Sequence, residues 1–431
     1  EAGGEAEEAP AGAGDEPAAK VPRTSRLPKR KMALVVGYCG TGYMGMQMNP
    51  RAKTIEAELE RAMFRAGGIS ARNYGFLDKV HFSRAGRTDK GVSAVAQVVA
   101  LQLEMADNEE GMVRRINEHL PADITVLDCM RVTGSFNARL WCSRRRYQYL
   151  IPTWVFSASH VSAVDGETGA PFRMSEAAVG RLNAALANFV GHAWYHNYTS
   201  SKTSEDGTCQ RQIFSFQASA PFVAEGGVEW IALTVLGQSF LLHQIRKMVA
   251  TTVDLVRSDR ASPEIASVIQ QSRNKGGHMV LPLAPGLGLY LDRLFFDDYN
   301  RRHVEDFNRQ AERQQAKAAT ETQSSEEAVV DKRRALDWDG NRWSEKLEDF
   351  KKQVVWKQIL EEETKEAVFA KWIIDLRSHP IQYKLEPEER KKVTTPSGPK
   401  ALPPTPPTPP PDSNSKETGE SETATEAASS E

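Results

Sequence analysis

The amino-acid sequence predicts an α+β fold in which two split β-α-β units of the ferredoxin-like type form a mainly antiparallel sheet with a central cleft. The first observation is that valine-rich segments typical of strands and segments with helical apolar spacing follow one another in the order β-α-β-β-α-β, and that this order occurs twice. The second is that 431 residues, of which 40% are hydrophobic, can bury a large core.

The first unit starts with the apolar strand "KMALVVGY". Its elements are predicted, in order, as a strand, a helix, two strands, a helix and a strand at 31–38, 54–66, 79–83, 92–103, 110–119 and 124–132. In the first helix, Ile55, Leu59 and Met63 fall on one face, and a pair of glycines after the helix predicts its end.

The second unit repeats the order of the first. Its strand, helix, two strands, helix and strand are predicted at 144–152, 175–190, 211–219, 228–236, 240–256 and 288–296. In its second helix, Leu242, Ile245 and Val249 are predicted to form the core face. Two such sheets placed side by side would leave a cleft between them, and this cleft is the expected site.

The remaining segments differ in composition from these units. Val355, Ile359, Phe369 and Trp372 predict that a helix over 350–376 docks on the core. We therefore divide the chain into five parts. A disordered acidic and then basic tail covers 1–30, an N-terminal subdomain 31–140 and a C-terminal subdomain 141–300. A charged linker with a helical extension follows at 301–384, and a disordered proline-rich and acidic tail at 385–431.

Composition argues against several classes of protein. The four cysteines lie far apart and no histidine pair has zinc-ligand spacing, which predicts a reducing compartment and no metal site. No apolar run approaches the roughly 18 residues of a membrane span, so no membrane partner is expected. The acidic start does not resemble a signal peptide, and because residue 1 is Glu rather than Met, an organelle presequence stays open.

The stretch "GTGYMG" at 40–45 matches the glycine spacing of a dinucleotide-binding loop and follows a strand. However, Asn49, Pro50 and Lys53 separate these glycines from the next helix, and the units that follow are not of the β-α-β-α type. A nicotinamide or flavin oxidoreductase is therefore disfavoured, and we expect a flexible glycine loop near the cleft.

The stretch "AGRTDKGVSA" at 85–94 contains a single acid, Asp89, close to Arg84, Arg87 and Lys90. Nearby positive charge lowers the pKa of a carboxyl group, so we expect Asp89 to be ionised and suited to act as a nucleophile or an electrostatic stabiliser. From this stretch alone, a salt-bridged aspartate in a turn is the alternative.

Two further segments favour chemistry over a simple turn. In "FNARLWCSRRRYQYLIP" at 136–152, Tyr147 and Tyr149 share one face of a strand that also carries Arg144 and Arg145, a combination that binds phosphates and stacks on bases. In "GQSFLLHQIRKMVA" at 237–250, a histidine and an arginine three residues apart, at 243 and 246, can face a cleft.

Together these segments resemble a known family. "RTDKGVSA", "FNAR" with "RRYQYLI", "GQSFLLHQIRKMV" and "LAPGLGLYL" are similar, in order and spacing, to the signature segments of the TruA family of tRNA pseudouridine synthases, as is the start "GYCGTGYMGMQ". The resemblance covers about residues 31–296. The helix at 350–376 and the exact motif sequence "RTDKGVSA" are most similar to those of the eukaryotic Pus1 branch of that family.

The resemblance implies an RNA pseudouridine synthase that needs neither cofactor nor metal. It implies that Asp89 attacks the target nucleoside at the uracil ring or at the ribose C1′, so that the base detaches, rotates and rejoins through carbon. Tyr147 would stack on the flipped uracil and serve as the base for late proton removal. Arg246 would pair with the carboxylate, and Arg87 would help to expel and replace the flipped base.

The same resemblance suggests which residues hold the RNA. The candidate contacts are the cationic side chains near these motifs and one histidine: Arg84, Lys90, Arg144, Arg145, His243 and Lys247. The implied partner is tRNA, with messenger RNA or small nuclear RNA as further candidates, in the nucleus, the mitochondrion or both. We expect a monomer, because the C-terminal helix would cover the surface by which bacterial relatives dimerise. A non-catalytic RNA-binding protein or RNA chaperone is the alternative function.

Overall fold

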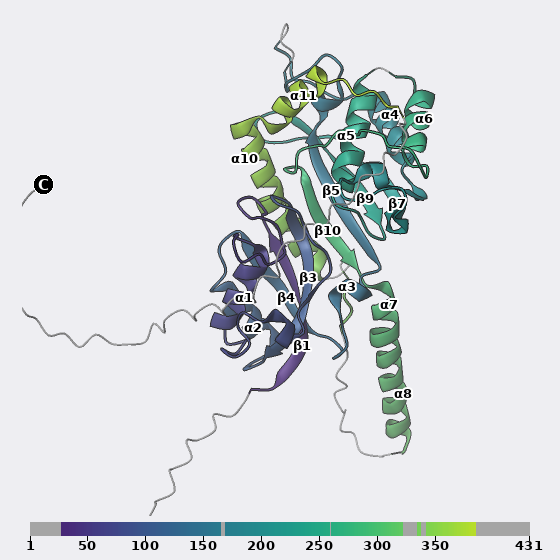
Figure 1. Ribbon diagram of the computed structural model, residues 1–431. Coiled ribbons are helices and arrows are strands. Elements are labelled where there is room, and N and C mark those ends of the chain that lie inside the picture. Colours follow the sequence, from purple (N-terminus) through teal and green to yellow (C-terminus); the bar gives the residue numbers. More distant parts are fainter. Residues whose placement is uncertain (1–26, 165–168, 259, 322–333, 338–341, 385–431) are drawn as a thin grey trace, which may run out of the picture.

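The computed structural model describes residues 27–164, 169–258, 260–321, 334–337 and 342–384 (Figure 1). Within these residues, the chain forms one ten-stranded sheet with helices packed against it. The predicted disordered tails lie outside the described residues, apart from the last residues of the first tail, where the sheet already begins at Lys29.

The sheet is mixed and mostly antiparallel, in agreement with the predicted α+β class. Its main path runs in the order β4-β1-β3-β10-β5-β9-β7-β6, with β2 added on β3 and β8 on β9. The strands are β1 (Lys29–Tyr38), β2 (Ser83–Arg84), β3 (Ser93–Glu104), β4 (Ile124–Arg131), β5 (Arg144–Pro152), β6 (Gly191–Trp194), β7 (Gln210–Ala218), β8 (Phe222–Val223), β9 (Glu229–Gly237) and β10 (Leu289–Phe295).

One strand joins the two halves of the sheet. β10 pairs antiparallel with β5 and parallel with β3, where Tyr290 is opposite Ser93. The mainly antiparallel sheet expected from the two units is therefore present, and this pairing makes it one continuous sheet. Figure 1 shows β10 at the centre of the molecule, between the strands of the two halves.

The helices of the N-terminal half are α1 (Ile55–Arg65) and α2 (Glu109–Asn117), as predicted. The Thr54 side chain caps α1 by accepting a hydrogen bond from the Ala57 amide. The strand predicted at 79–83 is largely wrong: Leu77–Val80 is a 3₁₀ turn and only the short β2 follows. The reason is His81, whose φ of 50° is left-handed and interrupts an extended chain.

The C-terminal half contributes α3 (Ala138–Trp141), α4 (Glu176–Ala187), α5 (Gln244–Arg257) and α6 (Ser262–Ser272). The helix predicted from 240 begins only at Gln244, because His243 has a left-handed φ of 64°. The prediction that Leu242 lies in the core is wrong as a result: this side chain is 44% exposed, and Leu241 is buried instead.

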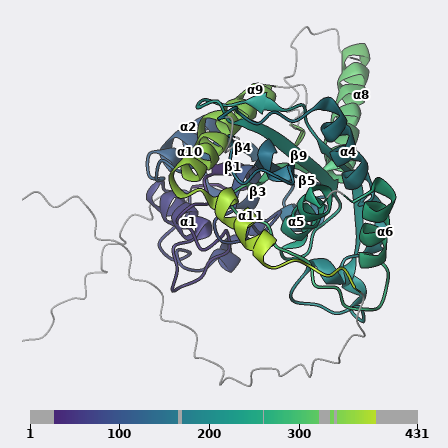
Figure 2. The same ribbon diagram turned by 90° about the horizontal axis from the view of Figure 1, so that it is seen from above.

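The C-terminal extension docks on the core as predicted but is not one helix. It consists of α9 (Arg342–Phe350), a π-helical segment (Lys351–Trp356), α10 (Lys357–Glu366) and α11 (Val368–Ser378). Ala367, with a φ of 50°, separates the last two helices. Figure 2 shows these helices running across both halves of the molecule, and the side chains of Val355, Ile359 and Phe369 are fully buried.

Two further helices precede the extension. They are α7 (Asp297–Asn300) and α8 (Asp306–Glu321), and α8 projects away from the body of the protein (Figure 1). Among the described residues, no helix combines the length and the apolar character that crossing a lipid bilayer requires.

Candidate active site

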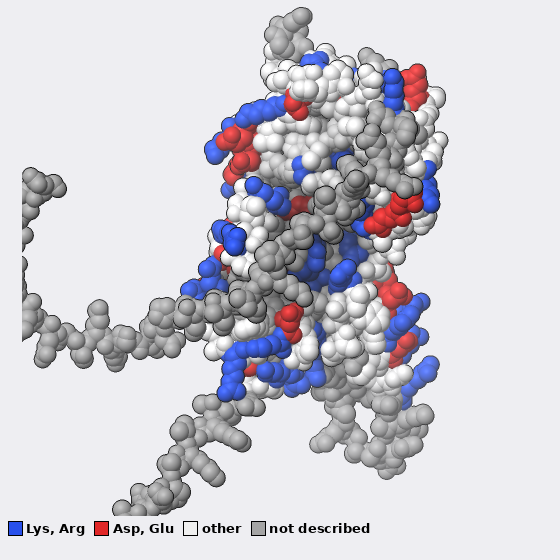
Figure 3. All heavy atoms as spheres, in the orientation of Figure 1, with Lys and Arg blue, Asp and Glu red and all other residues white. Residues whose placement is uncertain are grey.

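A cleft of about 840 Å³ lies over the middle of the sheet. One wall is the loop at 84–92 that contains Asp89, the floor includes Tyr147 of β5, and the opposite wall is the segment at 239–245 that leads into α5. In Figure 3, Lys and Arg side chains gather around the hollow at the middle of this face. The cleft therefore combines one carboxylate with a cationic surround.

The loop that carries Asp89 is held by hydrogen bonds from the sheet below it. The fully buried Gln97 of β3 uses its side-chain amide twice on Gly86: it accepts from the Gly86 amide at 3.2 Å and donates to the Gly86 carbonyl at 3.0 Å. The Tyr38 hydroxyl of β1 bonds the Thr88 hydroxyl at 2.8 Å. Gly86 and Thr88 lie within three residues before Asp89, so these bonds hold the backbone that leads to Asp89 before any substrate binds.

The glycine stretch at 40–45 packs directly on this loop. The Met46 amide donates to the Thr88 carbonyl at 3.1 Å. A Cβ atom on Gly40 would lie 2.3 Å from the Val92 carbonyl oxygen, and one on Gly45 would lie 2.9 Å from the Thr88 carbonyl oxygen. The glycines thus permit close backbone contact beneath Asp89, a structural use of the stretch that resembled a dinucleotide-binding loop.

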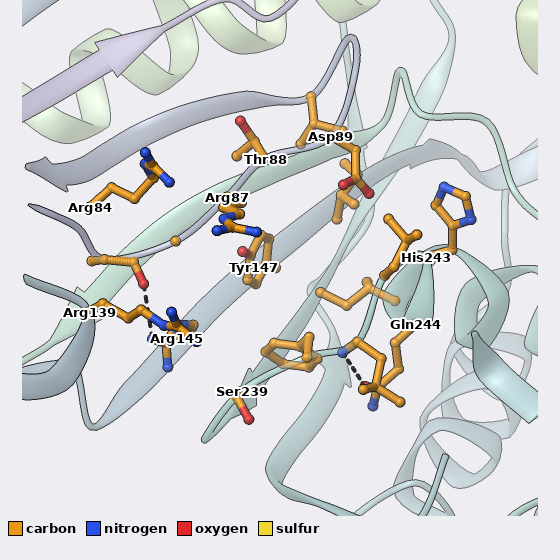
Figure 4. A pocket seen from close by; sticks show the side chains of 18 of the residues that line it. Arg84, Arg87, Thr88, Asp89, Arg139, Arg145, Tyr147, Ser239, His243 and Gln244 are labelled. Carbon is orange, nitrogen blue, oxygen red and sulfur yellow. Dashed lines mark hydrogen bonds between the residues drawn. The ribbon is translucent and has the colours of Figure 1, made fainter. Parts of the chain in front are cut away.

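Asp89 is half-buried, and its side chain is directed into the cleft (Figure 4). Burial raises the pKa of this carboxyl group, and the charges of His243 and Arg246 partly oppose that rise. Among the described residues, the carboxylate has neither a hydrogen-bond donor nor an ion-pair partner. A partly desolvated anion without an internal partner is available to a ligand.

The prediction that neighbouring cations lower the pKa of Asp89 is therefore wrong. Arg84 is ion-paired with the buried carboxylate of Glu56. Arg87 and Lys90 have exposed side chains, where water weakens their effect. These three cations are close to Asp89 in the sequence, but none of them forms an ion pair with its carboxylate among the described residues.

Tyr147 lies in the cleft as predicted and is only 8% exposed. Its ring packs edge-on against the ring of Phe240, with centroids 5.3 Å apart. Burial raises the pKa of Tyr147 to about 12, an effect that Arg145 opposes and the Asp89 charge reinforces. The hydroxyl is therefore protonated at neutral pH.

His243, which precedes α5, lines the cleft, whereas Arg246 in the first turn of α5 is not among the lining residues. Burial lowers the pKa of His243 and the charge of Arg246 lowers it further, whereas the charge of Asp89 opposes this shift. The Arg246 Nε donates to the Ala284 carbonyl at 2.7 Å. Asp89 and Arg246 attract each other, but they do not form an ion pair within 4.0 Å in this structure.

Of the six predicted RNA contacts, Arg84, Arg145 and His243 line the cleft. Arg145 also has an internal role: its guanidinium donates to the Gln238 carbonyl at 2.6 Å and to the Ala85 carbonyl at 2.9 Å. It thereby joins the two walls of the cleft. Arg84 is likewise occupied by its ion pair.

The other three predicted contacts are not among the residues that line the cleft. Arg144 forms a two-pronged ion pair with Asp297, at 3.0 and 2.9 Å. The Lys247 Nζ donates to the Asn197 carbonyl at 3.1 Å, and the Lys90 side chain is exposed beside the cleft.

Three basic residues of the cleft were not among the predicted site residues: Arg139, Lys202 and Arg211. Arg139 belongs to the "FNAR" motif, which could have indicated it. The other two lie outside the recognised segments and carried no signal. Within the described part of the chain, no group of three or more His, Cys, Asp or Glu side chains is arranged to hold a metal ion.

Comparison with known proteins agrees with this geometry. The family described as tRNA pseudouridine synthase matches residues 185–297. The chain is 35% identical to the mouse (Mus musculus) pseudouridylate synthase 1 homolog over 357 residues, covering 82% of this chain and 75% of that protein. It is 40% identical to the human (Homo sapiens) pseudouridylate synthase 1 homolog over 279 residues, covering 64% and 62%.

A fungal relative extends the comparison. The chain is 31% identical to tRNA pseudouridine synthase 1 of Saccharomyces cerevisiae over 361 residues, which cover 67% of this chain and 65% of that protein. These relatives share sequence with this chain over most of its length, and the family model agrees with their names. The chain therefore belongs to the tRNA pseudouridine synthase family.

Proposed function

We propose that this protein isomerises uridine to pseudouridine in tRNA, and that Asp89 is the residue that attacks the nucleoside. The observation that carries the proposal is the Asp89 carboxylate itself, which faces a cationic cleft, is held on a braced loop and has no partner among the described residues. Family membership supports the same reaction. A protein that only binds RNA has no need of this partly desolvated carboxylate.

The reaction balances without an oxidant or reductant, because uridine and pseudouridine are isomers. Asp89 attacks the uracil ring or the ribose C1′, so that a bond to its carboxylate oxygen forms and the C1′–N1 bond breaks; the bond to the carboxylate oxygen breaks again before the product leaves, which restores the free carboxylate. After the base rotates, the C1′–C5 bond forms, C5 loses its proton and N1 gains one. A target uridine must first leave its stack, which costs a few kcal/mol and favours loops or weak helices.

Tyr147 and the arginines are proposed to support this step. The Tyr147 ring, fixed edge-on against Phe240, offers a face for the flipped uracil. Because its pKa is about 12, the hydroxyl can act as a base only if substrate binding lowers that value. Arg246, attracted to Asp89 but not ion-paired with it, would stabilise the ionised carboxylate, and the exposed Arg87 is free to replace the flipped base.

We also propose that the two halves are separate ferredoxin-like subdomains, at 31–140 and 141–300. The support is that the four main strands of each half are arranged in the same order. If these strands are numbered along the chain, their order across the sheet is fourth, first, third, second: β4-β1-β3-β2 in one half and β10-β5-β9-β7 in the other. A monomer, a nuclear or mitochondrial location, and RNA substrates other than tRNA stay predictions. The C-terminal helices, which cover one side of both halves, support the monomer (Figure 2).

The proposed function is tested with tRNA that carries tritium at C5 of its uridines. Formation of the C1′–C5 bond must release that hydrogen to water, so the wild-type protein should release tritium and produce pseudouridine without added nicotinamide or flavin. Binding of tRNA without release would favour the non-catalytic alternative. Neither binding nor release, over a range of tRNAs, would refute the proposal.

Replacing Tyr147 with phenylalanine should slow product formation by about 10²-fold while leaving tRNA affinity within about twofold, because the ring stays and only the proton-accepting oxygen is lost. The measurement is the single-turnover rate of tritium release, with affinity from fluorescence anisotropy.

The matched control is Tyr149→Phe. Tyr149 lies two residues further along β5, and its hydroxyl donates to the Pro285 carbonyl at 2.7 Å. This control should lose about 1 kcal/mol of stability and keep its rate. Equal rates for Tyr147→Phe and wild type would remove Tyr147 from the proton transfer.

A further inference from the structure

The short helix α3 presents two exposed side chains next to each other, of which Arg139 lines the cleft and Leu140 does not. Arg139 lines the cleft, is exposed, and has neither a hydrogen-bond nor an ion-pair partner within the described ranges. The next residue, Leu140, is 80% exposed, the largest exposed fraction of any large hydrophobic side chain that the structure describes. A lone exposed leucine is common on protein surfaces, so its setting decides whether it matters.

The setting is a rigid one. The Asn137 side chain caps α3 by accepting hydrogen bonds from the amides of Arg139 and Leu140, at 3.0 and 3.2 Å. The Ala138 amide donates to the buried Ser83 hydroxyl at 3.0 Å, which ties α3 to the strand before the Asp89 loop.

The other end of α3 is also fixed. The Trp141 ring packs edge-on against the rings of Tyr299 and His303, with centroids 5.7 and 5.1 Å apart. Arg139 and Leu140 therefore project from a turn that is held at both ends, and binding a ligand there would not require the backbone to be ordered first.

Arg139 differs from two neighbouring arginines of the cleft, Arg84 and Arg145, whose guanidinium groups are bound within the protein. Arg84 is neutralised by Glu56, and Arg145 is occupied by two carbonyl groups. Figure 4 shows Arg139 on the same side of the cleft as Arg145 and away from His243. A guanidinium with all its donors free is suited to a phosphate, which it can bind through two parallel hydrogen bonds.

We infer that Arg139 and Leu140 form a binding element for the RNA strand that flanks the target uridine: Arg139 contacts a backbone phosphate and Leu140 packs against an adjacent unstacked base. Apolar side chains bind unstacked bases without selecting a sequence, and a cation beside them holds the backbone. The inference rests on the proposed function, because it takes its ligand to be the RNA that carries the reacting uridine.

The test measures tRNA affinity by fluorescence anisotropy over a range of salt concentrations, with the full chain. Arg139→Gln should weaken binding and reduce the slope of log affinity against log salt by about one, since one phosphate contact is lost. Leu140→Ala should weaken binding by about threefold to tenfold with no change in slope, since no charge is lost. Leu140→Met should recover most of that affinity.

The control variants are Arg114→Gln on α2 and Ile374→Ala on α11, an exposed cation and a 54% exposed apolar residue that do not line the cleft. Both should bind as wild type does. If the Arg139 and Leu140 variants match these controls while wild type binds tRNA, the inference is overturned and the proposed function stands. If wild type itself does not bind tRNA, both are overturned.

Discussion

Asp89→Asn should reduce pseudouridine formation by at least about 10³-fold, because the amide keeps the shape of the side chain but removes the attacking anion. The loop around residue 89 should keep its structure, since its hydrogen bonds come from Gln97 and Tyr38 and not from the Asp89 side chain. The measurement is multiple-turnover tritium release from uridine-labelled tRNA.

The matched control is Asp78→Asn, an exposed acid in the 3₁₀ turn that does not line the cleft. It should keep the wild-type rate. An Asp89→Asn protein with a rate similar to that of this control would exclude Asp89 as the attacking residue.

Asp89→Asn should also change the thermal stability of the protein. Burial raises the pKa of Asp89 in the folded state, so the folded state binds the proton more tightly than the unfolded state does, and the ionised carboxylate opposes folding at neutral pH. Asp89→Asn should therefore have a melting temperature at pH 7 at or above that of wild type. The difference should shrink as the pH falls through the raised pKa, and a clearly lower melting temperature for the variant would contradict this account.

Gly40→Ala should lower the free energy of unfolding by about 2–4 kcal/mol and remove most of the activity. The added Cβ would lie 2.3 Å from the carbonyl oxygen of Val92 and 2.4 Å from its carbonyl carbon, and a backbone contact of this kind cannot be relieved by a side-chain rotation. The segment that must move is the one that carries Asp89. Urea unfolding and the tritium assay measure the two effects.

A second glycine of the same stretch provides the control. Gly42 has a φ of 83°, but a Cβ there would have no atom within 4 Å among the described residues. Gly42→Asn should therefore cost about 1 kcal/mol and leave the rate unchanged, because asparagine tolerates a left-handed backbone. Equal stability losses in the two variants would mean that Gly40 is needed for its flexibility and not for close packing.

Much of the fold could be predicted because strand and helix signals are local. The strands around Tyr38, Tyr147 and Val235 combine β-branched and aromatic residues over a sufficient length, and they form where predicted. The pairing that joins the two halves of the sheet could not be predicted, because the parallel contact of Tyr290 with Ser93 links residues almost 200 positions apart in the chain. Neither segment carries a local signal of its partner.

The ends of elements were less predictable than their centres, for a related reason. His81, His243 and Ala367 adopt positive φ without being glycine, and this conformation is imposed by the surrounding structure. Each of them interrupts an element that the apolar pattern alone would continue. For this reason the apolar pattern predicts Leu242 in the core, whereas its side chain is 44% exposed and lines the cleft.

Sequence motifs predict the residues of the candidate site, but they do not predict which charges lie near Asp89 or the direction of its pKa shift. The sequence shows three cations close to Asp89, whereas the structure pairs Arg84 with Glu56, a residue 28 positions earlier, and brings His243 and Arg246 near the carboxylate from α5. Burial, which a sequence does not reveal directly, determines the direction of the pKa shift.

The most direct test of the central claim, that Asp89 attacks the nucleoside, is one turnover of C5-tritiated tRNA with enzyme in excess, at a concentration where anisotropy shows all the tRNA bound. Under these conditions, differences in affinity cannot change the result. The account predicts that wild type releases tritium in a single exponential phase and that bound Asp89→Asn releases none. Release by the bound variant at the wild-type rate would contradict it.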